Sequence, residues 1–323
     1  MNNNNYTEAA LAKMNAVISE IKKAVVGKDD IITKVLLAII AKGHILIEDI
    51  PGVGKTTMAL AFSKVLALDY NRMQFTPDVL PTDVTGFTIY NKAAGQFEFK
   101  KGVAMCNLFL ADEINRTSSK TQSALLEVME EGSITVDGNT YELPKPYIVI
   151  ATQNPIGSVG THMLPESQLD RFMIKLSMGY PDLNSEMRIL KTRMNNPIDD
   201  IKQIASTRDI IALQQIAENV YIDDKIYLYI ARLADATRNH PMISLGLSPR
   251  GAISLVAISK AAALLNGRNY VTPQDIFFVF SDVAAHRIML HSKARLSELT
   301  AEAIIEEILK SVPLPKLSEK VQS

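Results

Sequence analysis

The sequence has little of what marks secreted and membrane proteins. It contains one cysteine, Cys106, so no disulfide can form within the chain, and this fits a reducing compartment. No apolar run approaches the roughly 18 residues that a membrane-spanning helix needs. The first residues, MNNNNYTEAA, lack the basic start and the apolar stretch of a signal peptide. Together these absences predict a cytoplasmic protein that is not inserted into a membrane.

An excess of charge of either sign is also missing. The 323 residues include 34 Lys and Arg against 35 Asp and Glu, and this balance argues against nucleic acid as a partner. Apolar residues make up 47%, which is enough for a large buried core, and the length suggests about two domains. Cys106 stands at the start of an apolar run and is predicted to be a small core residue rather than a nucleophile.

The first half of the chain alternates short strand-like runs with helical patterns. Candidate strands occupy 44–48, 70–76, 107–111, 147–152 and 171–177, and helical patterns lie between them at 56–68 and 120–131. Three of the strand runs are almost wholly apolar, as strands covered on both faces of a parallel sheet are. The pattern predicts an α/β domain with a parallel sheet.

Two segments interrupt this alternation, and the second half has another texture. The stretches 86–102 and 132–143 each predict a hairpin inserted into the α/β core. After about residue 181 helical periods follow one another, over 182–195, 207–219, 223–239, 249–266 and 273–291. We therefore expect an N-terminal helix and α/β core over 1–184 and a helical second domain over 185–323.

A glycine-rich turn between a strand and a helix predicts a phosphate-binding loop, or Walker A motif. Gly52 and Gly54 give a permissive backbone, Lys55 is placed to reach the β- and γ-phosphates, and the Thr56 hydroxyl is a ligand for Mg²⁺. Aspartate, one of the non-glycine residues most tolerant of unusual φ, replaces the first glycine of the usual pattern. The predicted nucleotide-binding residues of this loop are Asp49, Pro51, Gly52, Val53, Gly54, Lys55, Thr56 and Thr57.

Hydrolysis needs acidic groups on a neighbouring strand, and the sequence supplies a Walker B motif. In NLFLADEINR the apolar run ends in Asp112 and Glu113, and the carboxyl edge of a parallel sheet is where ligands bind. Asp112 is predicted to hold Mg²⁺ through its water shell, and Glu113 to orient and activate the attacking water. The run YIVIATQNP brings Asn154 to the same edge, where its amide can bond the γ-phosphate or the water.

Two arginines complete the candidate catalytic set. Arg171 follows a short helical turn in LPESQLDRF. Arg250 lies in the first turn of a helix that Ser248 caps and Pro249 opens, where a cation opposes the helix dipole. Because this helix end is unfavourable for a cation, we expect the Arg250 side chain to serve another purpose, such as pairing with phosphate.

Together these residues make the chain similar to the MoxR family of AAA+ ATPases. The resemblance runs from AVVGKDD at 24–30 through the helical domain, about nine-tenths of the length. The most specific segments are IEDIPGVGKTT, RMQFTPDVLPTDVTGF, LFLADEINRTSSKTQSALLEVMEE, VIATQNP, LPESQLDRFMIKL and LSPRGA. An aspartate at the first loop position is familiar in this family.

The resemblance implies more than the residues alone do. It implies a five-stranded sheet of order 5-1-4-3-2, a helical lid, and a ring, usually a hexamer, with ATP at the subunit interfaces. Glu113 matches the catalytic glutamate, Asn154 sensor 1, Arg171 an arginine finger acting on a neighbour's ATP, and Arg250 sensor 2. The two hairpins match inserts that face the pore or the client in related machines. Val26 and Gly27, in the segment where the resemblance begins, join the predicted nucleotide-binding residues.

Some positions depart from the family pattern. The stretch KKGVAMCN stands where relatives usually carry a glycine-proline pair together with bulkier apolar residues, His162 stands near a usual tyrosine, and Lys28 stands where glutamine is common. None of these positions belongs to the phosphate-binding set, so they bear on client contacts rather than on hydrolysis.

The function expected from this reading is an ATP-driven chaperone that uses Mg²⁺ and matures a partner. The resemblance suggests a von Willebrand factor A-domain protein or a metal-cofactor enzyme as the client. Three alternatives stay open: the motor subunit of a metal chelatase, a nucleic-acid-dependent ATPase, and a module that binds ATP without turnover. The neutral charge balance argues against the second, and the Asp112-Glu113 pair against the third.

Overall fold

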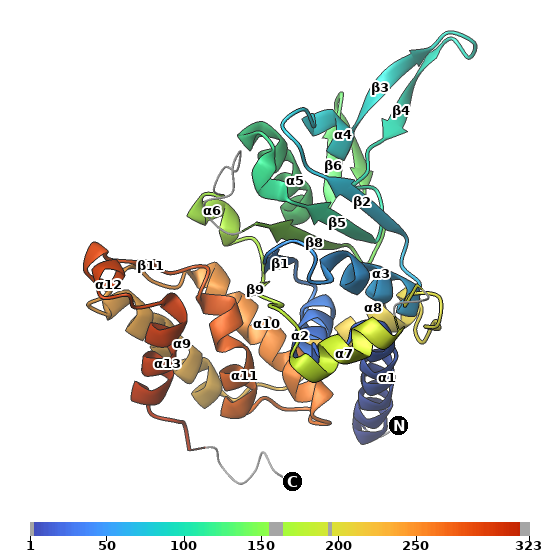
Figure 1. The fold of residues 1–323 in the computed structure, drawn as a ribbon. Coiled ribbons are helices and arrows are strands. Elements are labelled where there is room, and N and C mark those ends of the chain that lie inside the picture. Colours follow the sequence, from blue (N-terminus) through green and yellow to red (C-terminus); the bar gives the residue numbers. More distant parts are fainter. Residues whose placement is uncertain (1–2, 155–163, 193–195, 317–323) are drawn as a thin grey trace.

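A computed structural model describes residues 3–154, 164–192 and 196–316. Its core is a parallel sheet of five strands in the order β2-β5-β8-β1-β9 (Figure 1). The strands are β1 (Ile45–Glu48), β2 (Tyr70–Gln74), β5 (Leu108–Asp112), β8 (Ile148–Gln153) and β9 (Ile174–Leu176). Counted along the core this order is 5-1-4-3-2, so the predicted α/β fold is confirmed.

Alternation along the strands divides the core into two layers. Ile45, Ile47, Leu108 and Leu110 pack with helices on one side, and Leu46, Phe109 and Ala111 pack on the other. Because both faces are covered, β5 is buried along its whole length. The first layer contains α1 (Asn3–Ala24), α2 (Asp29–Ile40) and α3 (Lys55–Val65), and the second contains α5 (Ser119–Glu131).

Both inserted hairpins form where the sequence predicts them. The longer one, β3 (Gly86–Asn91) with β4 (Gln96–Lys101), projects from the body of the molecule (Figure 1). The shorter one pairs β6 (Ser133–Val136) with β7 (Asn139–Glu142). Its turn residues, Asp137 and Gly138, both have positive φ, as a two-residue hairpin turn requires. The rings of Phe99 and Tyr141 stack with centroids 3.9 Å apart and join the two hairpins.

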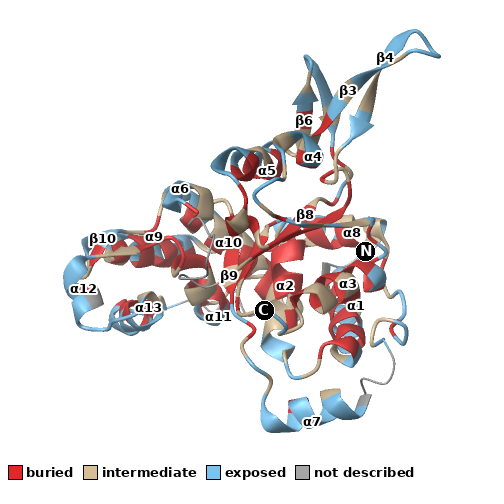
Figure 2. Ribbon diagram, turned by 45° about the horizontal axis from the view of Figure 1, so that its top comes forward, coloured by how far each residue is buried: buried red, intermediate tan, exposed pale blue. Residues whose placement is uncertain are grey.

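The C-terminal part is a bundle of helices that shares the core with α1, α2 and α3. Short elements complete the first half: α4 (Pro81–Thr85), the 3-10 helix η1 (Ile114–Arg116) and α6 (Glu166–Leu169). Figure 2 shows that the sheet and the helix faces against it are buried, whereas the hairpin β3–β4 and α7 (Leu183–Thr192) are largely exposed. The bundle contains α8 (Thr207–Glu218), α9 (Asp224–Asn239), α10 (Pro249–Leu265), α11 (Pro273–Ala284), α12 (Ser292–Leu296) and α13 (Ala301–Ser311), and α7 stands apart from it (Figure 2).

One predicted helix is too long. The pattern over 273–291 predicts a single helix, but α11 ends at Ala284, and Met289–Leu290 form β11, which pairs with β10 (Ile243–Leu245). His286 and Arg287, between α11 and β11, bond backbone carbonyls of the segment before β9. These long-range contacts outweigh the local helical period, which cannot report them.

Two remaining expectations concern single residues. Cys106 is fully buried, and burial raises the pKa of its thiol to about 12, so it is a core residue as predicted. His162 lies outside the described residues.

Within the described ranges, none of the helices combines the length and the apolar character that crossing a bilayer takes.

Candidate active site

The loop after β1 has the backbone of a phosphate site. Gly52 and Gly54 have φ of 87° and 99°, a region that residues with a side chain rarely adopt. The space around Gly52 is open, since a Cβ built there meets nothing within 4 Å. Helix α3 begins at Lys55, directly after Gly54, so its first N–H groups and the positive end of its dipole face the loop.

Asp49 has a role that φ tolerance does not explain. It is not among the residues with positive φ. Its Oδ2 instead accepts hydrogen bonds from the backbone N–H of Met178, at 2.5 Å, and of Gly179, at 2.6 Å, and from the Ser177 hydroxyl. Its Oδ1 accepts from the Ile50 N–H. The carboxylate therefore ties the phosphate loop to the segment that follows β9, which corrects the conformational reason expected from the sequence.

Replacing Asp49 with asparagine is expected to lower both stability and ATP affinity. The amide offers one oxygen where the carboxylate offers two, so at least one buried N–H loses its acceptor, at a cost of about 1–3 kcal/mol. Thermal unfolding and ATP titration calorimetry measure the two effects. The exposed Asp200→Asn change is the matched control, and equal behaviour of the two variants would contradict this role of Asp49.

Lys55 lies at the centre of this loop. Its Nζ donates to the backbone oxygen of Asp49 at 2.7 Å and to that of Ile50 at 3.3 Å. Burial lowers the pKa of the Lys55 ammonium, and the carboxylates of Asp112, Asp49 and Glu113 offset part of this effect. A partly desolvated ammonium can bind an anion such as phosphate. The carboxylates around it can hold a metal ion between themselves and that anion.

Asp112 is held at the end of β5 by two neighbouring strands. Its Oδ1 accepts the Thr152 hydroxyl of β8 at 2.6 Å, and its Oδ2 pairs with Arg72 of β2 at 2.8 Å. The parallel register sets this up, because Gln74 lies opposite Asp112, and Ala111 is opposite Ala151, directly before Thr152. The carboxylate is thus fixed at the carboxyl edge of the sheet, beside the phosphate loop.

Glu113 stands on strained backbone next to Asp112. Its φ of 56° and ψ of 50° are uncommon for glutamate, and such strain is found where function demands a given direction. Its carboxylate accepts from Arg116 Nη1 at 2.8 Å and from Asn154 Nδ2 at 3.0 Å. Burial raises the pKa of this carboxyl, but the hydrogen bonds from Arg116 and Asn154 outweigh it, so the pKa lies below its ordinary 4.5. Glu113 is an ionised, oriented group.

The segment with Val26 and Gly27 lies beside the same loop. Lys28 donates through Nζ to the backbone oxygens of Met178 and Tyr180, the latter at 2.9 Å. These two residues belong to the segment after β9, whose backbone N–H groups also bond Asp49. Gly27 has φ of 73°, and a Cβ there would lie 2.2 Å from the Ser185 hydroxyl. The chain therefore passes close to α7 at this point, which only glycine allows.

Arg171 and Arg250 lie together, but away from Lys55. Arg171 Nη2 is 3.1 Å from Glu130 Oε2, and Arg250 Nη2 pairs with Glu130 Oε1. Glu130 follows Met129, whose carbonyl is 3.0 Å from the His44 ring, and His44 directly precedes β1. Arg171 itself precedes β9. The two guanidinium groups therefore lie at the amino edge of the sheet.

The two edges are far apart. Five residues of extended chain, about 16 Å, separate His44 from Asp49, where the phosphate loop begins. Neither arginine has a described contact with Lys55, Asp112 or Glu113 among the hydrogen bonds and ion pairs of the described chain. The geometry assembles Lys55, Asp112, Glu113 and Asn154 at one edge and places Arg171 and Arg250 at the opposite one.

Sequence reasoning missed the residues that hold these groups in place. Thr152 and Arg72 bond the Asp112 carboxylate, Arg116 bonds the Glu113 carboxylate, and Glu130 pairs with both Arg171 and Arg250. Thr152 and Arg116 carried a local signal, since one ends a predicted strand and the other lies one helical turn after Glu113. Arg72 and Glu130 carried none, because their partners depend on strand order and on the packing of α5.

The donor set at the carboxyl edge fits ATP with Mg²⁺. An open glycine loop, a helix N-terminus and an ammonium suit a triphosphate. The hydroxyl of Thr56, at the start of α3, and the carboxylate of Asp112 are hard oxygen ligands of the kind that Mg²⁺ prefers.

Comparisons with known proteins agree with this fold and site. Residues 44–174 match the profile of the ATPase family associated with various cellular activities (AAA), and residues 235–308 match that of the AAA lid domain. YeaC of Bacillus subtilis, an uncharacterised protein, is 48% identical over 96% of this chain and 97% of the relative. Chaperone MoxR1 of Mycobacterium tuberculosis is 39% identical over 96% of this chain and 84% of the relative. A crystal structure from Cytophaga hutchinsonii, of a protein assigned by inference as an ATPase, superposes with a TM-score of 0.88 at 39% identity, over 97% and 98% of the two chains.

A parallel sheet of this order, a phosphate loop, an acidic strand end and a helical lid define an AAA+ ATPase. Within that class, the chain belongs to the MoxR family. It is an enzyme that hydrolyses ATP, of the MoxR chaperone type.

Proposed function

We propose that six copies of this chain form a ring in which ATP lies between the carboxyl edge of one subunit and the amino edge of the next. The observation that carries the proposal is the separation of the two halves of the site. Arg171 and Arg250 are held side by side on Glu130, at the edge of the sheet opposite to the phosphate loop of their own subunit. A head-to-tail contact between copies brings such halves together and closes into a ring.

Each residue then has a definite role in turnover. The loop from Asp49 to Thr57, with Val26 and Gly27 beside it, binds the nucleotide. Thr56, and Asp112 through water, would hold Mg²⁺, which would neutralise charge on the phosphates. Glu113 orients the attacking water and takes its proton.

Asn154 and the arginines complete the set. Asn154 keeps the Glu113 carboxylate in place, and its own Oδ1, buried without a partner in the described chain, is an acceptor for that water. Arg171 and Arg250 of the neighbour stabilise the charge that develops on the γ-phosphate.

The client-facing surface is the hairpin β3–β4. Four apolar side chains are at least 46% exposed there, and Phe97, at 73%, is the most exposed of them. Tyr90 packs edge-on against Phe97 with ring centroids 5.2 Å apart, but a two-stranded hairpin that projects from the body of the molecule leaves these side chains exposed. The set is Phe87, Ile89, Tyr90 and Phe97. We infer that this hairpin contacts a protein client, which the family resemblance suggests is a von Willebrand factor A-domain protein or a metal-cofactor enzyme. The buried, unpaired Cys106 supports a cytoplasmic setting.

A substrate trap tests this proposal. Glu113→Gln is expected to bind ATP without turnover and to retain its client, so a pull-down with ATP and Mg²⁺ should enrich one protein over the wild type. Lys55→Ala, which removes the ammonium from the phosphates, is the control that should retain nothing.

The identity of the retained protein separates the alternatives. A von Willebrand factor A-domain protein or an enzyme lacking its metal supports the chaperone function, whereas a porphyrin-binding protein would favour a chelatase motor. Stimulation of ATP turnover by DNA at moderate salt, with no protein retained, would overturn the proposal in favour of a nucleic-acid motor.

A further inference from the structure

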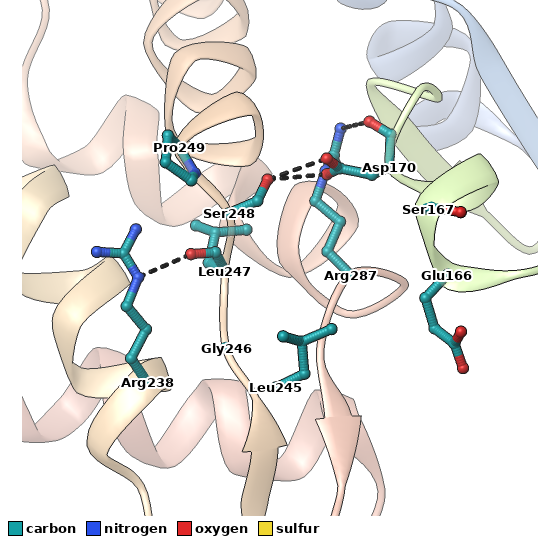
Figure 3. Close-up of a pocket in the computed structure, with 10 residues that line it drawn as sticks. All are labelled: Glu166, Ser167, Asp170, Arg238, Leu245, Gly246, Leu247, Ser248, Pro249 and Arg287. Atoms are coloured by element: carbon teal, nitrogen blue, oxygen red, sulfur yellow. Dashed lines mark hydrogen bonds and ion pairs between the residues drawn. The ribbon is translucent and has the colours of Figure 1, made fainter.

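Arg287, a lid residue, reaches into the core and binds the segment that carries Arg171. Its side chain is 1% exposed, and its Nε lies 2.8 Å from Asp170 Oδ1 (Figure 3). Its other nitrogens donate to the backbone oxygens of Asp170 at 3.1 Å, Phe172 at 2.6 Å and Met173 at 3.0 Å. A guanidinium is suited to this task because its donors form a rigid planar fork.

Asp170 joins this cation to the start of α10. The Ser248 hydroxyl is shared between both oxygens of the Asp170 carboxylate, at 3.0 and 3.1 Å (Figure 3). The same Ser248 oxygen accepts the N–H of Gly251, at 3.0 Å, and so caps α10. The position of the first turn of α10, which contains Arg250, is therefore set by Asp170.

The network thus fixes two arginines at once. Arg171 is the residue after Asp170, and Arg250 is the second residue after Ser248. Their side chains meet on Glu130, so a displacement of Arg287 or Asp170 would move both guanidinium groups away from the neighbour's nucleotide. Misplacement of a catalytic group by about 1 Å can cost 10²-fold in rate.

We propose that Arg287 is a positioning residue, which acts through Asp170 and Ser248 to hold Arg171 and Arg250 in one rigid frame for the active site of the neighbouring subunit. This inference rests on the proposed function, in which both arginines act on a neighbour. Arg287 would therefore contribute to ATP hydrolysis in the neighbouring subunit rather than in its own. Arg250 of the lid and Arg171 then enter the neighbour's active site as one rigid unit.

The first test is a kinetic comparison of Arg287→Lys and Asp170→Asn with the wild type. Lysine keeps the charge but not the fork, and asparagine keeps the shape but not the charge. Both variants should lower kcat about 10–10²-fold and leave KM for ATP nearly unchanged, since their own phosphate loops are intact. Arg238→Lys is the matched control. Arg238 lines a cavity of about 440 Å³ together with Asp170, Ser248 and Arg287. Among the residues drawn in Figure 3, however, it bonds only the Leu247 carbonyl, at 2.9 Å.

The second test separates a positioning role from a purely structural one. Arg287→Lys is mixed with Glu113→Gln, which has intact arginines but a silent site of its own. In a randomly mixed ring about a quarter of the sites would combine an intact Glu113 with intact neighbouring arginines, so turnover should rise above that of either variant alone. Asp170→Asn is the partner in the same mixture if Arg287→Lys does not fold.

Rescue of ATP turnover in these mixtures separates a positioning role of Arg287 from a structural one. If Arg171→Ala is rescued by Glu113→Gln but the Arg287 and Asp170 variants are not, the positioning role is wrong and the network only stabilises its own subunit. If none of the three is rescued, the shared site itself is wrong. Wild-type kcat in Arg287→Lys or Asp170→Asn would also overturn the inference.

Discussion

Replacing Arg171 with alanine is expected to lower ATP turnover about 10³–10⁵-fold, the range typical of an arginine finger. ATP affinity should change little, because Lys55 and the glycine loop that bind the phosphates lie at the other edge of the sheet. The physical reason is that a cation supplied by a neighbour stabilises charge that appears only in the transition state. Phosphate release measures the first quantity, and titration calorimetry the second.

The control for this variant is Arg232→Ala, which removes an exposed arginine from α9 of the lid. It should turn over ATP like the wild type. Arg171→Ala should also regain turnover when it is mixed with Lys55→Ala, because each variant supplies the half that the other lacks. Mixing Arg171→Ala with Arg250→Ala should restore nothing, since both lesions fall in the same half. Turnover by Arg171→Ala alone at the wild-type rate would remove it from the site.

The sheet was predictable because its strands have a strong local signal. β5 and β8 are apolar runs that are buried on both faces, and a chain that alternates such runs with helices has few topologies open to it. The strand order itself came from the family resemblance. The end of α11 at Ala284 was not predictable from local periodicity, because the contacts of Arg287 with residues far away in sequence end that helix.

The candidate site likewise contains residues that could be predicted from the sequence and residues that could not. Lys55, Thr56 and the Asp112-Glu113 pair are recognisable because each must occupy one position relative to a strand end. The direction in which Arg250 points was not recognisable, since its partner Glu130 comes close only after α5 has packed and α10 has been capped through Asp170. Asp49 shows a third case, in which the residue type was noticed but its bonds to Met178 and Gly179 required the fold.

Replacing Glu113 with glutamine is expected to lower turnover about 10²–10⁴-fold, as the loss of a general base does. Glutamine has nearly the same shape, so ATP affinity should stay close to that of the wild type. It cannot take a proton from water, and it offers a single oxygen to the two donors from Arg116 and Asn154. Single-turnover hydrolysis separates the chemical step from product release, and the exposed Glu127→Gln on α5 is the matched control.

The pH dependence of the wild type gives an independent check on Glu113. Hydrogen bonds from Arg116 and Asn154 hold the pKa of its carboxyl below 4.5, so the base is already ionised in neutral solution. Turnover should therefore show no acid limb from this group between about pH 6 and 8, and lowering the pH within that window should not protonate it. An acid limb near neutrality that Glu113→Gln abolishes would mean that burial, rather than the two hydrogen bonds, controls the carboxyl, and the geometry assigned to the lytic water would then be wrong.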